Sequence, residues 1–311
     1  MDRYVAPLKF IQFQVWQDCK NGCRFCSEKQ YPSNKLDDIK FVLNKLNSEE
    51  MLEFDEVGII GGEFFDDQLE DAEVQEKFYE MCYKMCTMHF KKIYIATSLI
   101  YDMSIYFAPF LDKLREWGVA DKVLICTSWD SFLRFSTFDK YVQWKVNMGL
   151  LRRYYSDFKT HIEVILTGHF IDSVLSGAIN ITELSTQYNS RIDFIEPTSG
   201  LSYKDKHALQ KVCPNFFPTK EQFMKFIKSE CVSKKTVDIR CLISYQIRAS
   251  RVYHKDQGKF VCYYDRRDPA FKVESLDTSY KCDVGMIDSD ESMESICTAI
   301  CDMLPEEFYD E

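Results

Sequence analysis

Residues 10–26, Phe-Ile-Gln-Phe-Gln-Val-Trp-Gln-Asp-Cys-Lys-Asn-Gly-Cys-Arg-Phe-Cys, indicate the fold of this 311-residue chain more strongly than any other stretch. The first seven residues are rich in aromatic and β-branched side chains and predict a strand. Cys19, Cys23 and Cys26 follow it directly, in the spacing C-x3-C-x2-C. Three thiolates this close, on a loop that an Asn-Gly pair makes pliable, can bind one face of a metal centre.

The cysteine spacing leaves three interpretations open. The thiolates could bind zinc together with a distant fourth ligand, or they could be chance neighbours in a chain with 13 cysteines. They could also bind a cubane cluster, in which three cysteines occupy three of the four irons and leave the last iron open to another ligand. The position of the loop, at the end of the first predicted strand, favours the cluster.

Strand-like and helix-like segments alternate through the first two thirds of the chain. Apolar, β-branched stretches lie at residues 10–16, 57–60, 93–97, 123–127, 162–166 and 192–195. Segments with helical spacing of apolar residues lie between them, at 36–46, 74–88, 105–117, 141–155 and 171–188. This order predicts βα units with parallel strands, in a doubly wound sheet or an incomplete barrel. In both architectures the functional residues lie at the carboxyl ends of the strands.

A second short motif, Gly61-Gly62-Glu63, ends the second predicted strand. Two glycines allow a backbone to approach a ligand closely, and a carboxylate accepts hydrogen bonds from an ammonium group. The same residues would equally suit an ordinary turn between a strand and a helix, with the glutamate in solvent. The cysteine loop that precedes this motif is what favours the ligand-binding interpretation.

The cysteine loop resembles that of the radical S-adenosylmethionine (SAM) superfamily. That family has C-x3-C-x-aromatic-C after the first strand of a partial (β/α)6 barrel, and Phe25 fills the aromatic position here. The resemblance implies an α/β fold of this TIM-type barrel class. It also implies that Cys19, Cys23 and Cys26 bind a 4Fe–4S cluster whose fourth iron binds SAM.

The second motif extends the resemblance. In the family a Gly-Gly-Glu-Pro segment meets the amino group of SAM, which implies this role for Gly61, Gly62 and Glu63. Phe64 stands where the family has proline, so the turn that follows Glu63 departs from the family pattern.

Further SAM contacts are implied at the ends of the later strands. By strand order, the resemblance implies polar contacts after the third strand, ribose contacts after the fourth and adenine contacts after the fifth and sixth. The residues in these positions are Thr97 and Ser98, then Ser128 and Asp130, then Leu166 and Glu196. The polar residues among them would also suit helix caps or turns.

The chain changes character after residue 200. We expect a catalytic core at residues 1–200, a connecting helical segment at 201–232 and a small α+β C-terminal domain at 233–311. In the last of these, strands are predicted at 239–247, 251–253 and 259–264, a hairpin turn at 256–258 and a helix at 290–304.

Residues 256–262 resemble the hairpin of SPASM and twitch domains, which add auxiliary iron–sulfur clusters to radical SAM barrels. The closely spaced cysteines expected near the end of such a domain are missing from this sequence. The cysteines of this region are therefore either ligands of a second iron–sulfur cluster or buried apolar side chains. They are Cys241, Cys262, Cys282, Cys297 and Cys301.

Composition and charge narrow the partners and the compartment. The net charge of −10 disfavours duplex nucleic acid, because proteins that bind it carry a basic face. No apolar run approaches the ~20 residues that span a bilayer, so we expect no membrane partner. The odd number of cysteines and an N-terminus without the apolar core of a signal peptide indicate a reducing compartment, which we expect to be the cytoplasm.

The resemblance implies an enzyme that reductively cleaves SAM to a 5′-deoxyadenosyl radical, with electrons from a donor such as flavodoxin or ferredoxin. The SPASM-like segment favours a peptide or protein side chain as the substrate. A nucleotide, a nucleobase or another small metabolite is the alternative substrate, and a non-catalytic metal-binding scaffold is the alternative class of protein. No pattern selects a hydrogen donor or a catalytic acid.

Overall fold

The computed structural model describes most of the first 195 residues and short parts of the chain beyond them. The described residues are 9–16, 18–23, 34–130, 134–195, 215–216, 218–219, 222, 225–226, 229, 249–254 and 258–262. The predicted site residues Cys26 and Glu196 lie outside them, as do Cys241, Cys282, Cys297 and Cys301.

Six strands run parallel and pair in chain order. They are β1 (Lys9–Gln14), β2 (Glu56–Ile60), β3 (Lys92–Ala96), β4 (Val123–Trp129), β5 (Lys159–Ile165) and β6 (Arg191–Ile195). The helices are α1 (Lys35–Leu46), α2 (Ala72–Thr87), α3 (Phe107–Glu116), α4 (Phe138–Tyr154), α5 (Gly168–Leu175) and α6 (Ile181–Tyr188). Two 3-10 helices, η1 (Glu49–Glu53) and η2 (Ala120–Lys122), precede β2 and β4. The predicted alternation of strands and helices is confirmed.

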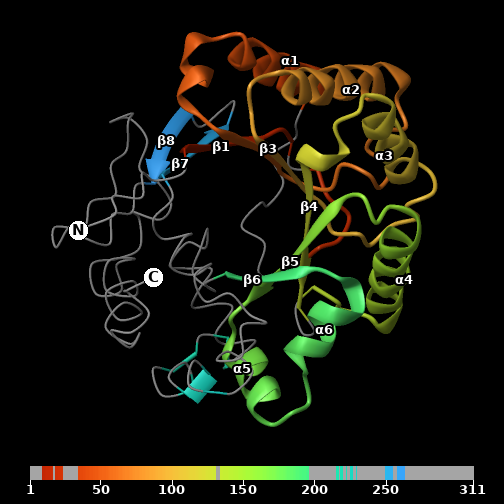
Figure 1. The fold of residues 1–311 in the computed structure, drawn as a ribbon, viewed down its shortest axis with the longest axis vertical. Helices are drawn as coiled ribbons and strands as arrows, with labels where there is room; N and C mark the ends of the chain where they lie inside the picture. Colours follow the sequence, from red (N-terminus) through yellow and green to blue (C-terminus); the bar gives the residue numbers. More distant parts are fainter. Residues whose placement is uncertain are drawn as a thin grey trace, which may run out of the picture.

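The strands line the inside of an arc and the helices cover its outer side (Figure 1). The sheet order is β6-β5-β4-β3-β2-β1-β7-β8, and no pairing among the described residues joins β6 to β8. In the part of the chain that the structure describes, the sheet is therefore a partial barrel whose end strands, β6 and β8, are not paired with each other. Of the two architectures that the alternation allowed, the incomplete barrel is the one observed.

The core lies between the sheet and the helices, because each helix buries one apolar stripe against the strands. Ile11 and Phe13 of β1 are fully buried. On α1, Ile39, Val42 and Leu46 recur at helical spacing and are buried in the same core. This packing holds the carboxyl ends of the strands in fixed relative positions, and the candidate site lies at those ends.

The predicted helix at 171–188 is two helices, so this prediction was wrong in detail. Gly177 has a φ of +78° and lies just beyond the end of α5, a backbone angle that glycine adopts without strain. The side chain of Asn180 then accepts a hydrogen bond from the backbone N–H of Glu183 and caps α6. The apolar periodicity continues across both helices and hides the break between them.

A hairpin from the C-terminal region joins the sheet. β7 (Ala249–His254) and β8 (Gly258–Cys262) pair antiparallel, which confirms the predicted hairpin. β7 also pairs parallel with β1, so the hairpin continues the sheet of the core beside the first strand. The predicted strand at 239–247 and helix at 290–304 lie outside the described residues, and the domain boundaries remain predictions. None of the described helices combines the length and apolarity needed to cross a bilayer.

Candidate functional site

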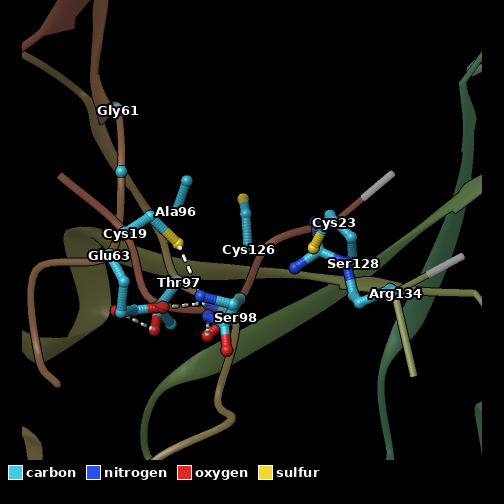
Figure 2. A pocket seen from close by; sticks show the side chains of 12 residues that line it. Cys19, Cys23, Gly61, Glu63, Ala96, Thr97, Ser98, Cys126, Ser128 and Arg134 are labelled. Atoms are coloured by element: carbon cyan, nitrogen blue, oxygen red, sulfur yellow. Dashed lines mark hydrogen bonds between the residues drawn. The ribbon is translucent and has the colours of Figure 1, made fainter. Parts of the chain in front are cut away.

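A cavity of about 110 Å³ lies at the carboxyl ends of β1 to β4 (Figure 2). Eight of the predicted site residues line it: Cys19, Cys23, Gly61, Gly62, Glu63, Thr97, Ser98 and Ser128. They come from four segments that are well separated in the sequence. The parallel strands bring them together because their carboxyl ends lie along the same edge of the sheet.

The described part of the cysteine loop brings Cys19 and Cys23 to the cavity, and Cys26 lies outside the described residues. Gly22, between them, has a φ of +58°, which allows the chain to turn there. Cys19 is exposed as a residue, yet the surroundings of its sulfur exclude enough water to raise the pKa of the thiol. The nearby charge of Glu63 raises that pKa further, while the backbone N–H of Asn21 opposes the increase. A metal cation would stabilise the thiolate against these effects.

Glu63 is buried at the centre of the site and its carboxylate is held by three donors. Oε1 accepts hydrogen bonds from the backbone N–H of Phe65, at 3.1 Å, and from the hydroxyl of Thr97, at 2.9 Å. Oε2 accepts one from the backbone N–H of Ser98, at 2.6 Å. Burial raises the pKa of Glu63, and the hydrogen bonds from Ser98, Phe65 and Thr97 partly offset that increase. Thr97 and Ser98, which follow β3 directly, thus hold this carboxylate beside the cysteine loop.

The Gly-Gly-Glu turn lies directly against the end of β1. The backbone N–H of Gly62 donates to the carbonyl of Trp16 at 2.7 Å, and that of Glu63 donates to the carbonyl of Asp18 at 3.0 Å. Gly61 has a φ of +149°, and a Cβ at this position would lie 2.1 Å from the carbonyl oxygen of Trp16. Only glycine fits there. The requirement for glycine thus arises from the contact between the two motifs themselves.

Phe64, which stands where the motif that the sequence resembles has proline, is fully buried. Its ring packs edge-on against Trp16, with 5.0 Å between ring centroids, and tilted against Phe78 of α2 at 5.4 Å. An aromatic pair of this kind stabilises the fold by more than the burial of its surface area alone would. The turn after Glu63 is therefore fixed by ring packing in this chain, where the family's proline would restrict φ.

The predicted SAM contacts at the ends of β4 and β5 lie in different surroundings from one another. Ser128 lines the cavity. Asp130 is buried, and its Oδ1 accepts from the backbone N–H of Arg134 at 3.3 Å, which is the turn role that the sequence left open. Leu166 is buried in the hydrophobic core. These two residues are not among those that line the cavity, and their predicted contacts with SAM remain predictions.

Four residues of the cavity were not predicted as site residues: Asn21, Ala96, Cys126 and Arg134. Arg134 brings a positive charge to the site. Asn21 lies inside the cysteine motif, at one of the positions that the motif leaves unspecified. Asn21 has no short-range signal, because its side-chain amide and its backbone carbonyl meet partners that are distant in the sequence.

The residues present fit an iron–sulfur cluster together with a ligand that carries an ammonium group and a carboxylate group. The described residues bring two of the three predicted cysteine ligands to the cavity, and thiolates are the ligands that such clusters use. The buried Glu63 carboxylate offers an acceptor for an ammonium group, and Arg134 offers a partner for a carboxylate. Gly61 and Gly62 also line the cavity, and because they have no side chains a ligand can approach their backbone closely.

No protein-family model matches this chain, and no curated protein matches it. It is similar to the structure of anSMEcpe with bound AdoMet and Cp18Cys peptide, with a TM-score of 0.48, 18% identity, and coverage of 71% of this chain and 58% of that chain. It is also similar to Streptococcus suis SuiB bound to S-adenosylmethionine, with a TM-score of 0.46, 12% identity, and coverage of 82% and 60%. For methylornithine synthase (PylB) the TM-score is 0.43, the identity 15%, and the coverage 87% and 80%. The chain thus spans 58% of anSMEcpe and 60% of SuiB.

Proposed function

We propose that this protein is a radical SAM enzyme that binds a 4Fe–4S cluster through Cys19, Cys23 and Cys26. One observation carries the proposal: the cysteine loop after β1 and the Gly-Gly-Glu turn after β2 are hydrogen-bonded to each other and line one cavity. A zinc site would account for the cysteines alone. It would not account for a buried carboxylate, held by three donors, beside them.

The chain's own residues would orient SAM at this site. Glu63 would accept a hydrogen bond from the ammonium group of SAM through Oε2, a carboxylate oxygen that can accept a further hydrogen bond beside the one from the backbone N–H of Ser98. Arg134 would pair with the carboxylate of SAM. Gly61 and Gly62 would let the methionine part approach the backbone closely. When bound, the reduced cluster supplies one electron for cleavage of SAM to methionine and a 5′-deoxyadenosyl radical.

The substrate in this proposal is a peptide or protein side chain, and the reductant is a small electron-transfer protein such as flavodoxin or ferredoxin. The resemblance of residues 256–262 to the SPASM hairpin supports this choice of substrate, and the strands β7 and β8 on either side of residue 256 pair antiparallel. Among the described residues β6 and β8 are not paired with each other, and in this proposal the substrate would reach the strand ends between them.

Anaerobic purification tests the proposal. After reconstitution with iron and sulfide the protein should hold about four irons per chain, or about eight if the C-terminal cysteines bind a second cluster. Dithionite and SAM should then release 5′-deoxyadenosine. Cys23→Ala should lose both iron and cleavage. Cys86→Ala, which changes a buried cysteine on α2 far from the motif, should keep both.

Two results would overturn this function. A preparation that binds one zinc per chain and takes up no iron would show a zinc site. A cluster-loaded protein that never releases 5′-deoxyadenosine from SAM would show a scaffold. The variant Glu63→Gln sharpens the test, because it keeps the shape of the side chain but loses its charge. It should weaken SAM binding roughly tenfold or more, the loss expected for one charged hydrogen bond.

A further inference from the structure

We propose that Asn21 and Lys140 form a clamp that fixes the cysteine loop against the Glu63 carboxylate and against α4. The proposal rests on the function proposed above, in which this loop holds the cluster. Asn21 is a positioning residue here: it acts through the cysteines on either side of it and through Glu63.

Among the described residues 18–23 of the loop, Asn21 is the one that is buried. It is 7% exposed, whereas Cys19, Lys20 and Gly22 around it are exposed. Burying an amide side chain is unfavourable unless its polar atoms find partners. The burial therefore indicates that the contacts of Asn21 hold the loop in one position.

Two strong contacts join Asn21 to distant parts of the chain. Its side-chain Nδ2 donates to the hydroxyl oxygen of Ser98, just after β3, at 2.8 Å. Its backbone carbonyl accepts from Nζ of Lys140, in the first turn of α4, at 2.6 Å. Within the loop, its backbone N–H points to the sulfur of Cys19 at 3.5 Å. The middle of the loop is thus tied to β3, to α4 and to the first cysteine.

Ser98 connects this clamp to the carboxylate. Its backbone N–H donates to Oε2 of Glu63 at 2.6 Å, while its hydroxyl oxygen receives Asn21 and the backbone N–H of Ile100. Asn21 and Glu63 are therefore held by the same residue. In the proposed function the cysteines bind the cluster and Glu63 binds SAM. Ser98, which contacts both Asn21 and Glu63, would therefore fix the position of the cluster relative to SAM. A displacement of about 1 Å between such groups is enough to slow a reaction strongly.

Lys140 adds a charge as well as a contact. A cubane cluster with three thiolates is anionic, and reduction adds one more electron, so a nearby ammonium group stabilises the reduced form more. The carboxylates of Glu63 and Asp66, which follow β2, act on Cys19 in the opposite direction. On the loop's other side, Lys140 comes from α4 and reaches the carbonyl between Cys19 and Cys23.

The contacts can be tested in the full chain without any metal. Hydrogen exchange of the peptide that contains residues 18–23 should speed up several-fold in Asn21→Ala and in Lys140→Met. Lys20→Met is the matched control, because it removes only an exposed ion pair between the same loop and Asp67. Lys145→Met, on the exposed side of α4, is the control for Lys140. Exchange in both clamp variants at the rate of the controls would overturn the clamp.

The charge is tested in the cluster-loaded protein. Lys140→Met should shift the reduction potential of the cluster to a more negative value. Lys140→Arg should keep the potential close to the wild-type value, since arginine keeps the charge and can donate to the same carbonyl. Lys145→Met should leave the potential unchanged. A potential that does not move in Lys140→Met would refute the electrostatic part of the proposal. Asn21→Ser, which keeps a small polar side chain, replaces Asn21→Ala if the latter does not fold.

The two proposals fail in different ways. If the wild-type protein binds no iron, the proposed function is refuted, while the exchange measurement on the metal-free chain still reports on the clamp. If the wild-type protein binds iron and cleaves SAM but Asn21→Ala and Lys140→Met behave like their controls, only the clamp is refuted.

Discussion

Gly61 shows how a single residue couples the two motifs of the site. Its missing side chain leaves room for the carbonyl of Trp16, and the next residue, Gly62, donates a hydrogen bond to that same oxygen. The glycines were predicted as a place where the backbone meets a ligand. The structure adds a second reason for Gly61, because its immediate neighbour is another part of the chain.

Gly61→Ala should therefore destabilise the protein, by about 1–3 kcal/mol for a strained backbone of this kind, and should lower SAM-dependent activity as the turn moves. Gly149→Ala is the matched control. Gly149 lies inside α4 with open space around it, so alanine should stabilise the protein by up to about 1 kcal/mol. Urea unfolding of the metal-free chain measures both changes. Equal effects of the two substitutions would contradict this account of Gly61.

Glu63 should make stability depend on pH. Its pKa in the folded chain is raised above the ordinary value of 4.5, so the folded state holds the proton more tightly than the unfolded state does. The stabilisation from this group is complete at pH values below 4.5 and is lost as the pH rises through the folded-state pKa. Relative to Glu63→Gln, the wild-type chain should therefore lose stability as the pH rises from acid to neutral. A difference in unfolding free energy between the two that stays constant with pH would sink this prediction.

Sequence reasoning missed Asn21 because the partners of this residue are remote in the sequence. Asn21 and Lys140 lie 119 positions apart, and Asn21 and Ser98 lie 77 apart. Cys19, Cys23 and Glu63 could be predicted because each belongs to a short motif next to a strand. A contact between an unspecified loop residue and a lysine on a later helix leaves no local pattern.

At the level of elements, the turn after β3 depends on α4. Leu99 in this turn has a φ of +55°, a conformation that costs a non-glycine residue free energy. Asn147 of α4 is buried, and its Nδ2 donates to the carbonyls of Leu99, at 3.0 Å, and Tyr101, at 2.7 Å. The helix thereby fixes the turn that carries Thr97 and Ser98.

Asn147→Ala should leave these two buried carbonyls without their donor and cost about 1–3 kcal/mol. It should also speed hydrogen exchange in residues 97–101. Asn44→Ala, at an exposed position on α1, is the control and should change the unfolding free energy by less than ~0.5 kcal/mol. If both asparagines could be replaced at equal cost, the turn would not depend on α4.

Helices and strands were predictable to the extent that their signals are local. The apolar spacing of 36–46 and the N-cap position of Asn34 both come from residues within the same few turns, and α1 forms there. The break between α5 and α6 was missed because the apolar stripe continues past Gly177. The partner of β7 was also missed, since strand pairing between residues 9–13 and 249–253 has no local trace.

At the scale of the whole molecule, β1 is an interior strand with β2 on one side and β7 on the other. A chain that ends after residue 248 would lack β7 and β8, and the backbone of β1 would be unpaired on that side. Hydrogen exchange in residues 9–14 should then speed up, while β4, which lies between β3 and β5, should keep its protection. Unchanged exchange in β1 would contradict its pairing with β7.

The pairing of β1 with β7 also bears on how the protein matures during synthesis. The cysteine loop follows β1, and that strand gains its second neighbour only after residue 254 has emerged from the ribosome. Until then the cysteine loop follows a strand that can pair on one side alone, and contacts over such a sequence separation form slowly. In the proposed function, assembly of the cluster should therefore follow the emergence of residue 254, when the strand before the cysteines is paired on both sides.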